Sequence, residues 1–130
     1  MNSLAQTPKK LITVFALAFV LNWVWEIVHS AFYTHYRGGA ITAFILLRAA
    51  LVDAGIILAL VLIAREFKLN RSSVVVAGGL VAALIIELWA LQTGRWAYNP
   101  LMPVLPIVGV GLTPLIQLAV TGYIAQKIVL

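Results

Sequence analysis

Three of the chain's four acidic residues, Glu26, Asp53 and Glu87, lie inside long apolar stretches. Ionised side chains are expensive to place there and usually serve a function. Arg48 lies in one of these stretches, but one guanidinium cannot neutralise three carboxylates, so at least one acid must be protonated, hydrated or bound to a cation or substrate. A carboxylic acid that desolvation keeps neutral is a ready proton donor for acid–base catalysis. We therefore predict Glu26 as the proton donor, Glu87 or Asp53 as the acceptor, and Arg48 as the residue that tunes them.

Polar and aromatic side chains accompany the acids at helical spacing. Asn22, Glu26, His29 and Tyr33 follow the i, i+4, i+7, i+11 pattern of one helix face, with Trp25 beside them. A second polar stripe repeats at i, i+4 and i+8 and consists of Thr113, Gln117 and Thr121. These stripes should face each other or a cavity. The residues that we expect to bind a substrate are Asn22, Trp25, His29, Trp89, Trp96, Tyr98 and Gln117.

The elements that position these residues must be membrane helices. The chain is 63% hydrophobic and only 10% charged, with a mean hydropathy of +1.05, far above the level of soluble proteins. Four apolar stretches, at about 11–33, 41–64, 74–93 and 104–129, are each near the ~20 residues that a helical span requires. We predict an all-α, four-helix transmembrane bundle that forms one domain over residues 1–130. The basic residues flank the apolar stretches, which excludes nucleic acid as a partner.

The basic residues also predict the orientation in the membrane. Six of them lie before the first stretch, in the second loop or at the end of the chain, whereas only Arg37 and Arg95 lie in the first and third loops. The positive-inside rule therefore places both termini in the cytoplasm of a multi-pass protein of the inner or plasma membrane. The alternative is that residues 1–30 are a signal peptide, but their apolar stretch is longer than the h-region of such peptides.

The predicted helix ends give the depth of each polar residue. At about 1.5 Å per residue, Glu26, Arg48 and Glu87 share a level roughly 10 Å below the non-cytoplasmic surface. A second level, about 16 to 20 Å down, consists of Asn22, Asp53 and Gln117. We expect Arg48 to pair with Glu26 or Glu87, and the third loop, around Trp96 and Tyr98, to form a lid over the outer level.

Other interpretations of the cluster remain open. The acids and Arg48 could form a packing network that only fixes how four helices associate. Gly79, Ala83 and Glu87 lie on one line of small residues, which is typical of close helix packing. Glu26 and His29 match half of the Glu-x-x-His element of di-iron bundles, but the chain has no second copy. The chain also has no Cys, P-loop or hydrolase motif. A single metal bound by His29 with Glu26 and Glu87 is sterically conceivable, but a lone His is more often structural, so we predict no metal and no cofactor.

The segment Asn22-Trp23-Val24-Trp25-Glu26 resembles the Asn-x-x-Trp-Glu segment of the membrane-bound terpene cyclases of fungal meroterpenoid pathways. The resemblance covers five of the 130 residues. It implies that Glu26 protonates an isoprenoid substrate, with Glu87 or Asp53 as a second acid. The whole pattern is also similar to small four-helix bacterial membrane proteins of unassigned function.

The leading functional prediction is acid–base isomerisation or cyclisation of an isoprenoid or another lipophilic small molecule. The expected partners are membrane lipids and this substrate, and a homo-oligomer is compatible with the sequence. One alternative is a proton or cation pathway, in which Asp53 and Glu26 form successive relay sites. A structural or accessory membrane subunit is the third class.

Overall fold

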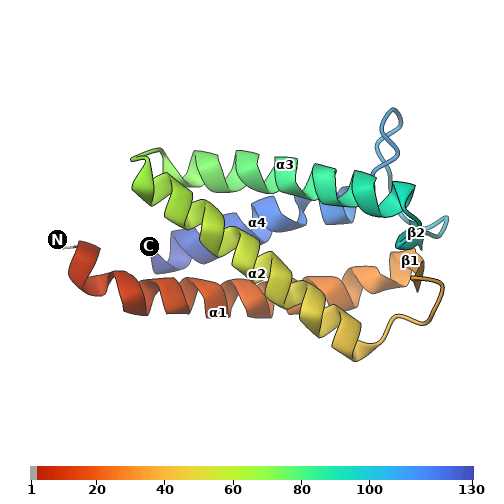
Figure 1. Ribbon diagram of the computed structural model, residues 1–130, viewed down its shortest axis with the longest axis horizontal. Helices are drawn as coiled ribbons and strands as arrows, with labels where there is room; N and C mark the ends of the chain where they lie inside the picture. Colours follow the sequence, from red (N-terminus) through yellow and green to blue (C-terminus); the bar gives the residue numbers. More distant parts are fainter. Residues whose placement is uncertain (1–2) are drawn as a thin grey trace.

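The computed structural model describes residues 3–130, with side chains described from Pro8 onward. Within this range the chain forms four α-helices, α1 (Ser3–His29), α2 (Ala43–Glu66), α3 (Arg71–Gln92) and α4 (Leu112–Val129) (Figure 1). A short 3-10 helix, η1 (Ser30–Phe32), follows α1, and two short strands, β1 (Tyr33–Tyr36) and β2 (Trp96–Tyr98), lie in the connections. The predicted all-α fold is confirmed.

Two predicted helix boundaries are wrong at the ends of the first helix. The helix expected at 11–33 begins at Ser3 and ends at His29, so the two lysines before the apolar stretch are helical. Ser30 begins η1, and its hydroxyl donates to the Ile27 carbonyl at 2.8 Å. Tyr33 belongs to β1 because its backbone pairs with that of Tyr98 in β2. Pairing between distant segments therefore overrides the helical spacing of Tyr33.

The start of the fourth helix is also later than predicted. The apolar stretch begins at residue 104, but α4 begins at Leu112. Pro106 cannot donate a backbone hydrogen bond, and Gly109 has a φ of +70°, so neither favours a helix. Pro114, which could kink a helix begun at residue 104, instead lies in the first turn of α4, where its missing N–H leaves no bond unmade.

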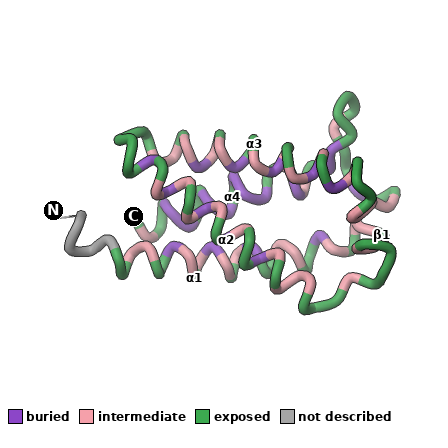
Figure 2. The backbone as a smooth tube through the Cα atoms, viewed as in Figure 1, coloured by how far each residue is buried: buried purple, intermediate pink, exposed green. Residues whose placement is uncertain are grey.

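The segment between β2 and α4 projects sideways from the bundle as a narrow hairpin (Figures 1 and 2). A β-bridge joins Val104 to Gly111, and the Leu105 N–H donates to the Val110 carbonyl at 2.9 Å. The tip is apolar and exposed, with Ile107 at 99% relative exposure.

The two strands link the first and third loops into a cap at one end of the bundle. They pair antiparallel, with Tyr33 opposite Tyr98 and Tyr36 opposite Trp96, and the register shifts between Tyr33 and His35. The lid that we expected around Trp96 and Tyr98 is therefore a two-stranded sheet, and its other strand comes from the first loop.

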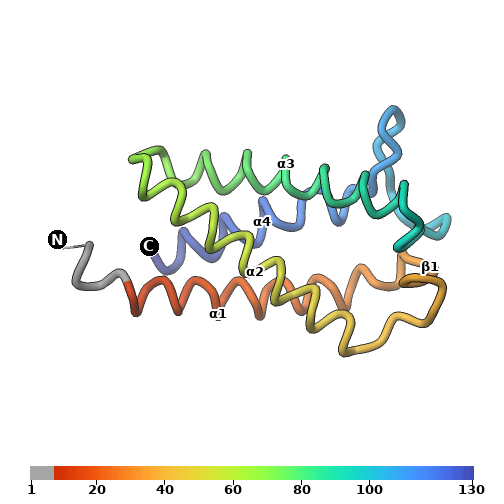
Figure 3. The backbone as a smooth tube through the Cα atoms, viewed as in Figure 1, coloured from red at the N-terminus to blue at the C-terminus, as the bar shows by residue number. Residues whose placement is uncertain are grey.

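The two ends of the bundle differ in charge. Both termini and the α2–α3 loop lie at one end, and β1 and β2 lie at the other (Figures 1 and 3). The six flanking basic residues lie at or near the end with the termini and are Lys9, Lys10, Arg65, Lys68, Arg71 and Lys127. Arg37 and Arg95 lie at the capped end. The asymmetry along the sequence is thus an asymmetry between the two ends of the molecule.

Small residues bring the helices close together in the half of the bundle nearer the termini. A Cβ built on Gly79 of α3 would lie 2.9 Å from the backbone nitrogen of Ala119 in α4. A Cβ on Gly122 of α4 would lie 2.7 Å from a Val75 methyl and 3.2 Å from Ile57 of α2. The buried positions of α3 recur every four residues through Val75, Gly79, Ala83 and Glu87, which agrees with close packing along the predicted small-residue line (Figure 2).

Within the described residues, three helical segments are long and apolar enough to cross a membrane, namely Pro8–Phe32, Ala43–Glu66 and Arg71–Gln92. They are typical of a membrane protein. α4 is shorter, at 18 residues, and its polar side chains Gln117, Thr121 and Gln126 are buried against the other helices.

Candidate functional site

A partly open cavity of about 240 Å³ lies between the four helices and the β1–β2 cap. It lies where α2, which meets α3 at the loop near the termini, diverges from α3 towards the capped end (Figure 1). Glu26, Asp53 and Glu87 all line it, and its wall is otherwise mostly apolar and aromatic. The predicted acids therefore face one space.

Gln117 of α4 joins three helices at the inner end of this cavity. Its Nε2 lies 2.9 Å from Asn22 Oδ1 of α1, 3.1 Å from Glu26 Oε2 of α1 and 2.9 Å from Asp53 Oδ2 of α2. The predicted inner level of Asn22, Asp53 and Gln117 is thus brought together, and Glu26 joins it. An amide nitrogen carries two hydrogens, so it cannot serve three oxygens fully at once.

Glu26 and Asp53 both lie against Gln117 Nε2, so their carboxyl groups are close enough to share a hydrogen bond when one of them is protonated. A hydrogen bond between two carboxyl groups needs one proton, because an ionised carboxylate has no donor. The pair can therefore hold one transferable proton beside one negative charge. This is the arrangement that acid–base chemistry requires.

His29 extends this pair towards the cap. Its Nε2 lies 2.8 Å from Glu26 Oε1, and its Nδ1 lies 3.0 Å from the Thr113 hydroxyl. Thr113 can donate either to His29 or to the Met102 sulfur, which lies 3.3 Å from its hydroxyl oxygen. The imidazole can therefore give a proton to Glu26 in one tautomer and take one in the other.

Glu87 occupies a separate part of the cavity wall, below the cap. One of its oxygens, Oε1, accepts hydrogen bonds from the Tyr98 hydroxyl at 2.6 Å, the Tyr33 hydroxyl at 3.1 Å and Trp96 Nε1 at 3.3 Å. Burial and the hydrogen bond to Glu87 raise the pKa of the Tyr98 hydroxyl well above its usual range, so it remains a donor. Three donors on one oxygen suit an ionised carboxylate.

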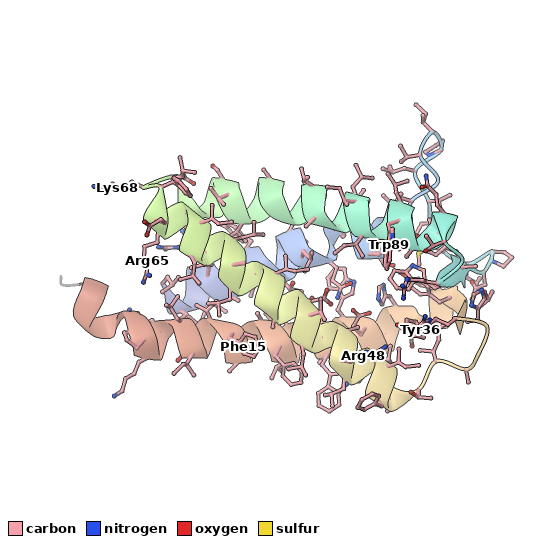
Figure 4. All side chains as sticks on the ribbon, in the orientation of Figure 1. Phe15, Tyr36, Arg48, Arg65, Lys68 and Trp89 are labelled. Carbon is pink, nitrogen blue, oxygen red and sulfur yellow. The ribbon has the colours of Figure 1, made fainter. Side chains whose placement is uncertain are left out.

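Arg48 does not pair with the acids, contrary to the prediction. Its Nη2 donates to the Tyr36 hydroxyl at 2.9 Å, and within the described residues no Lys or Arg forms an ion pair with Glu26, Asp53 or Glu87. Arg48 is exposed at the rim of the cavity, near Tyr36 of β1 (Figure 4). The reason is the course of α2, which carries Arg48 away from α3 and therefore away from Glu87.

The predicted binding residues fall into three groups. His29, Trp96 and Gln117 line the cavity. Asn22 and Tyr98 lie behind the wall, where they hold Gln117 and Glu87. Trp25 and Trp89 lie outside the lining.

The two outer tryptophans have other contacts. Trp25 Nε1 donates to the Thr113 carbonyl at 3.0 Å, which ties α1 to the start of α4. Trp89 is 47% exposed, and the guanidinium of Arg95 lies 4.2 Å from the centre of its ring (Figure 4). Both tryptophans contribute to packing at this end of the bundle rather than to the cavity wall.

The sequence reasoning missed the contribution of Tyr36. Tyr36 lines the cavity together with Tyr33, and its ring stacks on Trp96 with centroids 6.2 Å apart. A regular strand would send residues 33 and 36 to opposite faces, but the register shift between Tyr33 and His35 lets both reach the cavity. The signal in the sequence was the run Tyr33-Thr34-His35-Tyr36 before two glycines, which is typical of a strand and turn.

Among the described residues, no three His, Asp or Glu side chains are grouped so that they could hold a metal ion. No protein-family model, curated protein or solved structure matches this chain. The assignment of a function therefore depends on the geometry of the cavity and its acids.

Proposed function

We propose that the protein is an integral membrane enzyme that performs acid–base isomerisation or cyclisation of a lipophilic substrate, such as an isoprenoid lipid, without a cofactor. One observation carries this proposal. The carboxyl groups of Glu26 and Asp53 meet on Gln117 at the wall of a mostly apolar cavity of about 240 Å³. A carboxyl that faces apolar space keeps its proton at neutral pH and can deliver it to a carbon–carbon double bond or an ether oxygen of a bound substrate.

Glu26 is the proton donor in this proposal. It lines the cavity, shares the Gln117 amide nitrogen with Asp53, and lies 2.8 Å from His29. When Glu26 gives its proton to the substrate, the negative charge appears on Glu26, and Gln117 keeps a donor on this carboxylate and on that of Asp53. His29 can return a proton from Nε2 to Glu26 and take one up on Nδ1 from Thr113, which restores the donor after each turnover.

In this proposal the aromatic residues stabilise the positive charge that protonation creates on the substrate, and Glu87 removes a proton from it. Donors hold Glu87 Oε1 in place, and Oε2 can accept a proton from the substrate. The rings of Tyr33, Tyr36 and Trp96 line the cavity and offer π faces to a carbocation. Protonation by Glu26 and deprotonation by Glu87 would together give an isomerised or cyclised product of unchanged mass.

The route into the cavity suits a membrane substrate. The lining residues Ile45, Ala49 and Val52 of α2 and Ile86 of α3 come from two helices that diverge at this level. Both helices are apolar enough to cross a membrane. We propose four spans in a cell inner or plasma membrane, with both termini in the cytoplasm, because the more basic end then lies inside. The cavity then belongs to the outer half of the bilayer.

A proton or cation pathway has less support. The cluster below the acids is apolar and includes Val14, Ala18, Ile57, Val61 and Val75. The side chains of Val14, Ala18, Ile57 and Val75 are 0% exposed, and Val61 is 3% exposed. This layer separates Asn22 and Thr121 from the polar residues near the termini, so polar groups do not run through the bundle. A purely structural network also leaves the cavity unexplained, because protein interiors are normally filled.

The test compares wild type with Glu26→Gln and with the control Glu66→Gln, which changes an exposed acid at the end of α2. Each full-length protein is placed in lipid nanodiscs in D₂O with an isoprenoid panel or with lipids extracted from host membranes. We expect wild type and Glu66→Gln to give a product that carries one solvent deuterium on carbon, detected by mass spectrometry. Glu26→Gln should fold and give no such product. A wild type without any product, together with an unfolded Glu26→Gln, would show that the acids only support packing.

A further inference from the structure

Arg48 is the only Lys or Arg among the described residues that line the cavity. Its guanidinium lies near two rings, with Cζ 5.8 Å from the centre of Tyr36 and 6.0 Å from that of Phe44. The hydrogen bond to the Tyr36 hydroxyl uses one of the five N–H donors that an arginine carries. In a membrane the remaining donors need an acceptor, because hydrocarbon supplies none.

Arg48 and the acid pair lie at different depths of the same cavity. Arg48 precedes Asp53 by five residues on α2, which corresponds to about 7.5 Å along the helix axis. The lining residues between the two levels are apolar and include Ala49, Val52 and Ile86. The cavity therefore has a positive rim, a mostly apolar wall that also carries Glu87 below the cap, and an acidic inner end.

We infer that Arg48 binds the anionic head group, a phosphate or carboxylate, of an amphiphilic substrate whose chain extends to Glu26 and Asp53. A planar guanidinium matches these oxygen anions with two parallel hydrogen bonds. The Arg48 charge at the rim disfavours a cationic head, and the apolar wall fits a hydrocarbon chain. The group that receives the proton then lies several carbon atoms away from the head. This inference rests on the proposed function, since it defines the substrate class of the same site.

Binding of matched probes tests the inference without turnover. Dodecyl phosphate, dodecanoate, dodecanol and dodecylamine share one chain and differ in the head group. Binding of each radiolabelled probe to the full-length protein in phosphatidylcholine nanodiscs is measured as the excess over empty nanodiscs. The variants are Arg48→Met, Glu26→Gln and the control Arg95→Met, whose guanidinium stacks on Trp89 outside the cavity. Inorganic phosphate is added as a competitor to separate a head group from free phosphate.

We expect wild type to bind the two anionic probes at least about tenfold more tightly than dodecanol. Arg48→Met should lose this preference while it binds dodecanol as wild type does, and Arg95→Met and Glu26→Gln should keep the preference. Equal affinity for all heads, tighter binding of dodecylamine, or a preference that survives Arg48→Met would overturn the inference. Competition by inorganic phosphate as strong as that by dodecyl phosphate would also overturn it, because the site would then recognise the ion without the chain.

The two proposals can fail separately. If the preference of the protein for anionic head groups depends on Arg48 but no isoprenoid acquires solvent deuterium, the head-group site is supported and the acid–base function is refuted. If deuterium enters a neutral substrate, and Arg48→Met changes neither the rate of incorporation nor any binding preference, the acid–base function is supported and the head-group site is refuted.

Discussion

Replacement of Gln117 by methionine, which is similar in size, should destabilise the protein by an amount that the hydrogen bonds predict. The amide lies near three oxygens, and the loss of a donor to a buried group costs about 1–3 kcal/mol, so three independent losses would sum to about 3–9 kcal/mol. Two of the three side chains that Gln117 contacts keep another hydrogen-bond partner. Asn22 Oδ1 retains the Thr121 hydroxyl at 3.2 Å, and Glu26 retains His29 at 2.8 Å. Asp53 loses its donor on Oδ2, so we expect a total near 1–3 kcal/mol, at the scale of one unsatisfied group.

The assay is reversible unfolding in mixed micelles by titration with SDS, in a double-mutant cycle of Gln117→Met with Asp53→Leu. Asp53→Leu should cost less in the Gln117→Met background, with a coupling energy of about 1–2 kcal/mol. The matched control is Gln126→Met on the same helix. Gln126 binds Arg71 at 2.8 Å and Ser72 at 3.1 Å, near the other end of the bundle, and should not couple to Asp53. A loss below about 0.5 kcal/mol for Gln117→Met, or equal costs of Asp53→Leu in both backgrounds, would refute the reasoning.

Two further predictions concern packing and topology. Gly79→Ala should destabilise the bundle by about 1–3 kcal/mol, because the new methyl group meets the α4 backbone, whereas Gly55→Ala, where a Cβ has no neighbour within 4 Å, should be neutral or stabilising in the same unfolding assay. A tolerated Gly79→Ala would mean that α3 and α4 are less closely packed. A cysteine at Lys68 should be shielded from a membrane-impermeant thiol reagent in intact cells, and one at the exposed Thr34 should react. The reverse pattern would place the cavity in the inner half of the bilayer.

The sequence predicted the features that depend on local composition and helical spacing. Apolar length identified the helices, and the depth estimate brought Asn22, Asp53 and Gln117 to one level, where the structure joins them. The i, i+4 line from Gly79 to Glu87 identified the buried face of α3. Each of these follows from the helical repeat alone.

Features that depend on contacts between distant segments were not predictable in this way. The pairing of residues 33–36 with 96–98 ends the first helix early and places three donors on Glu87. Neither segment alone specifies that pairing. The position of Arg48 depends on how far α2 diverges from α3, and a helical repeat contains no information on the crossing of two helices. Similarity of depth therefore did not make Arg48 and Glu87 neighbours.

The apolar layer below the acids means that the proposed chemistry can exchange protons with only one side of the membrane. Val14, Ile57, Val61 and Val75 close the bundle between the acid pair and the end that carries the termini. Protons can then reach Glu26 and Asp53 from the capped side, through His29 and Thr113, but not from the opposite compartment. In the proposed orientation, acidification outside the cell membrane would change the occupancy of the acid pair, while the cytoplasm could vary in pH without effect. A catalyst built this way works inside the bilayer and responds to the proton concentration of only one of the two solutions that the bilayer separates.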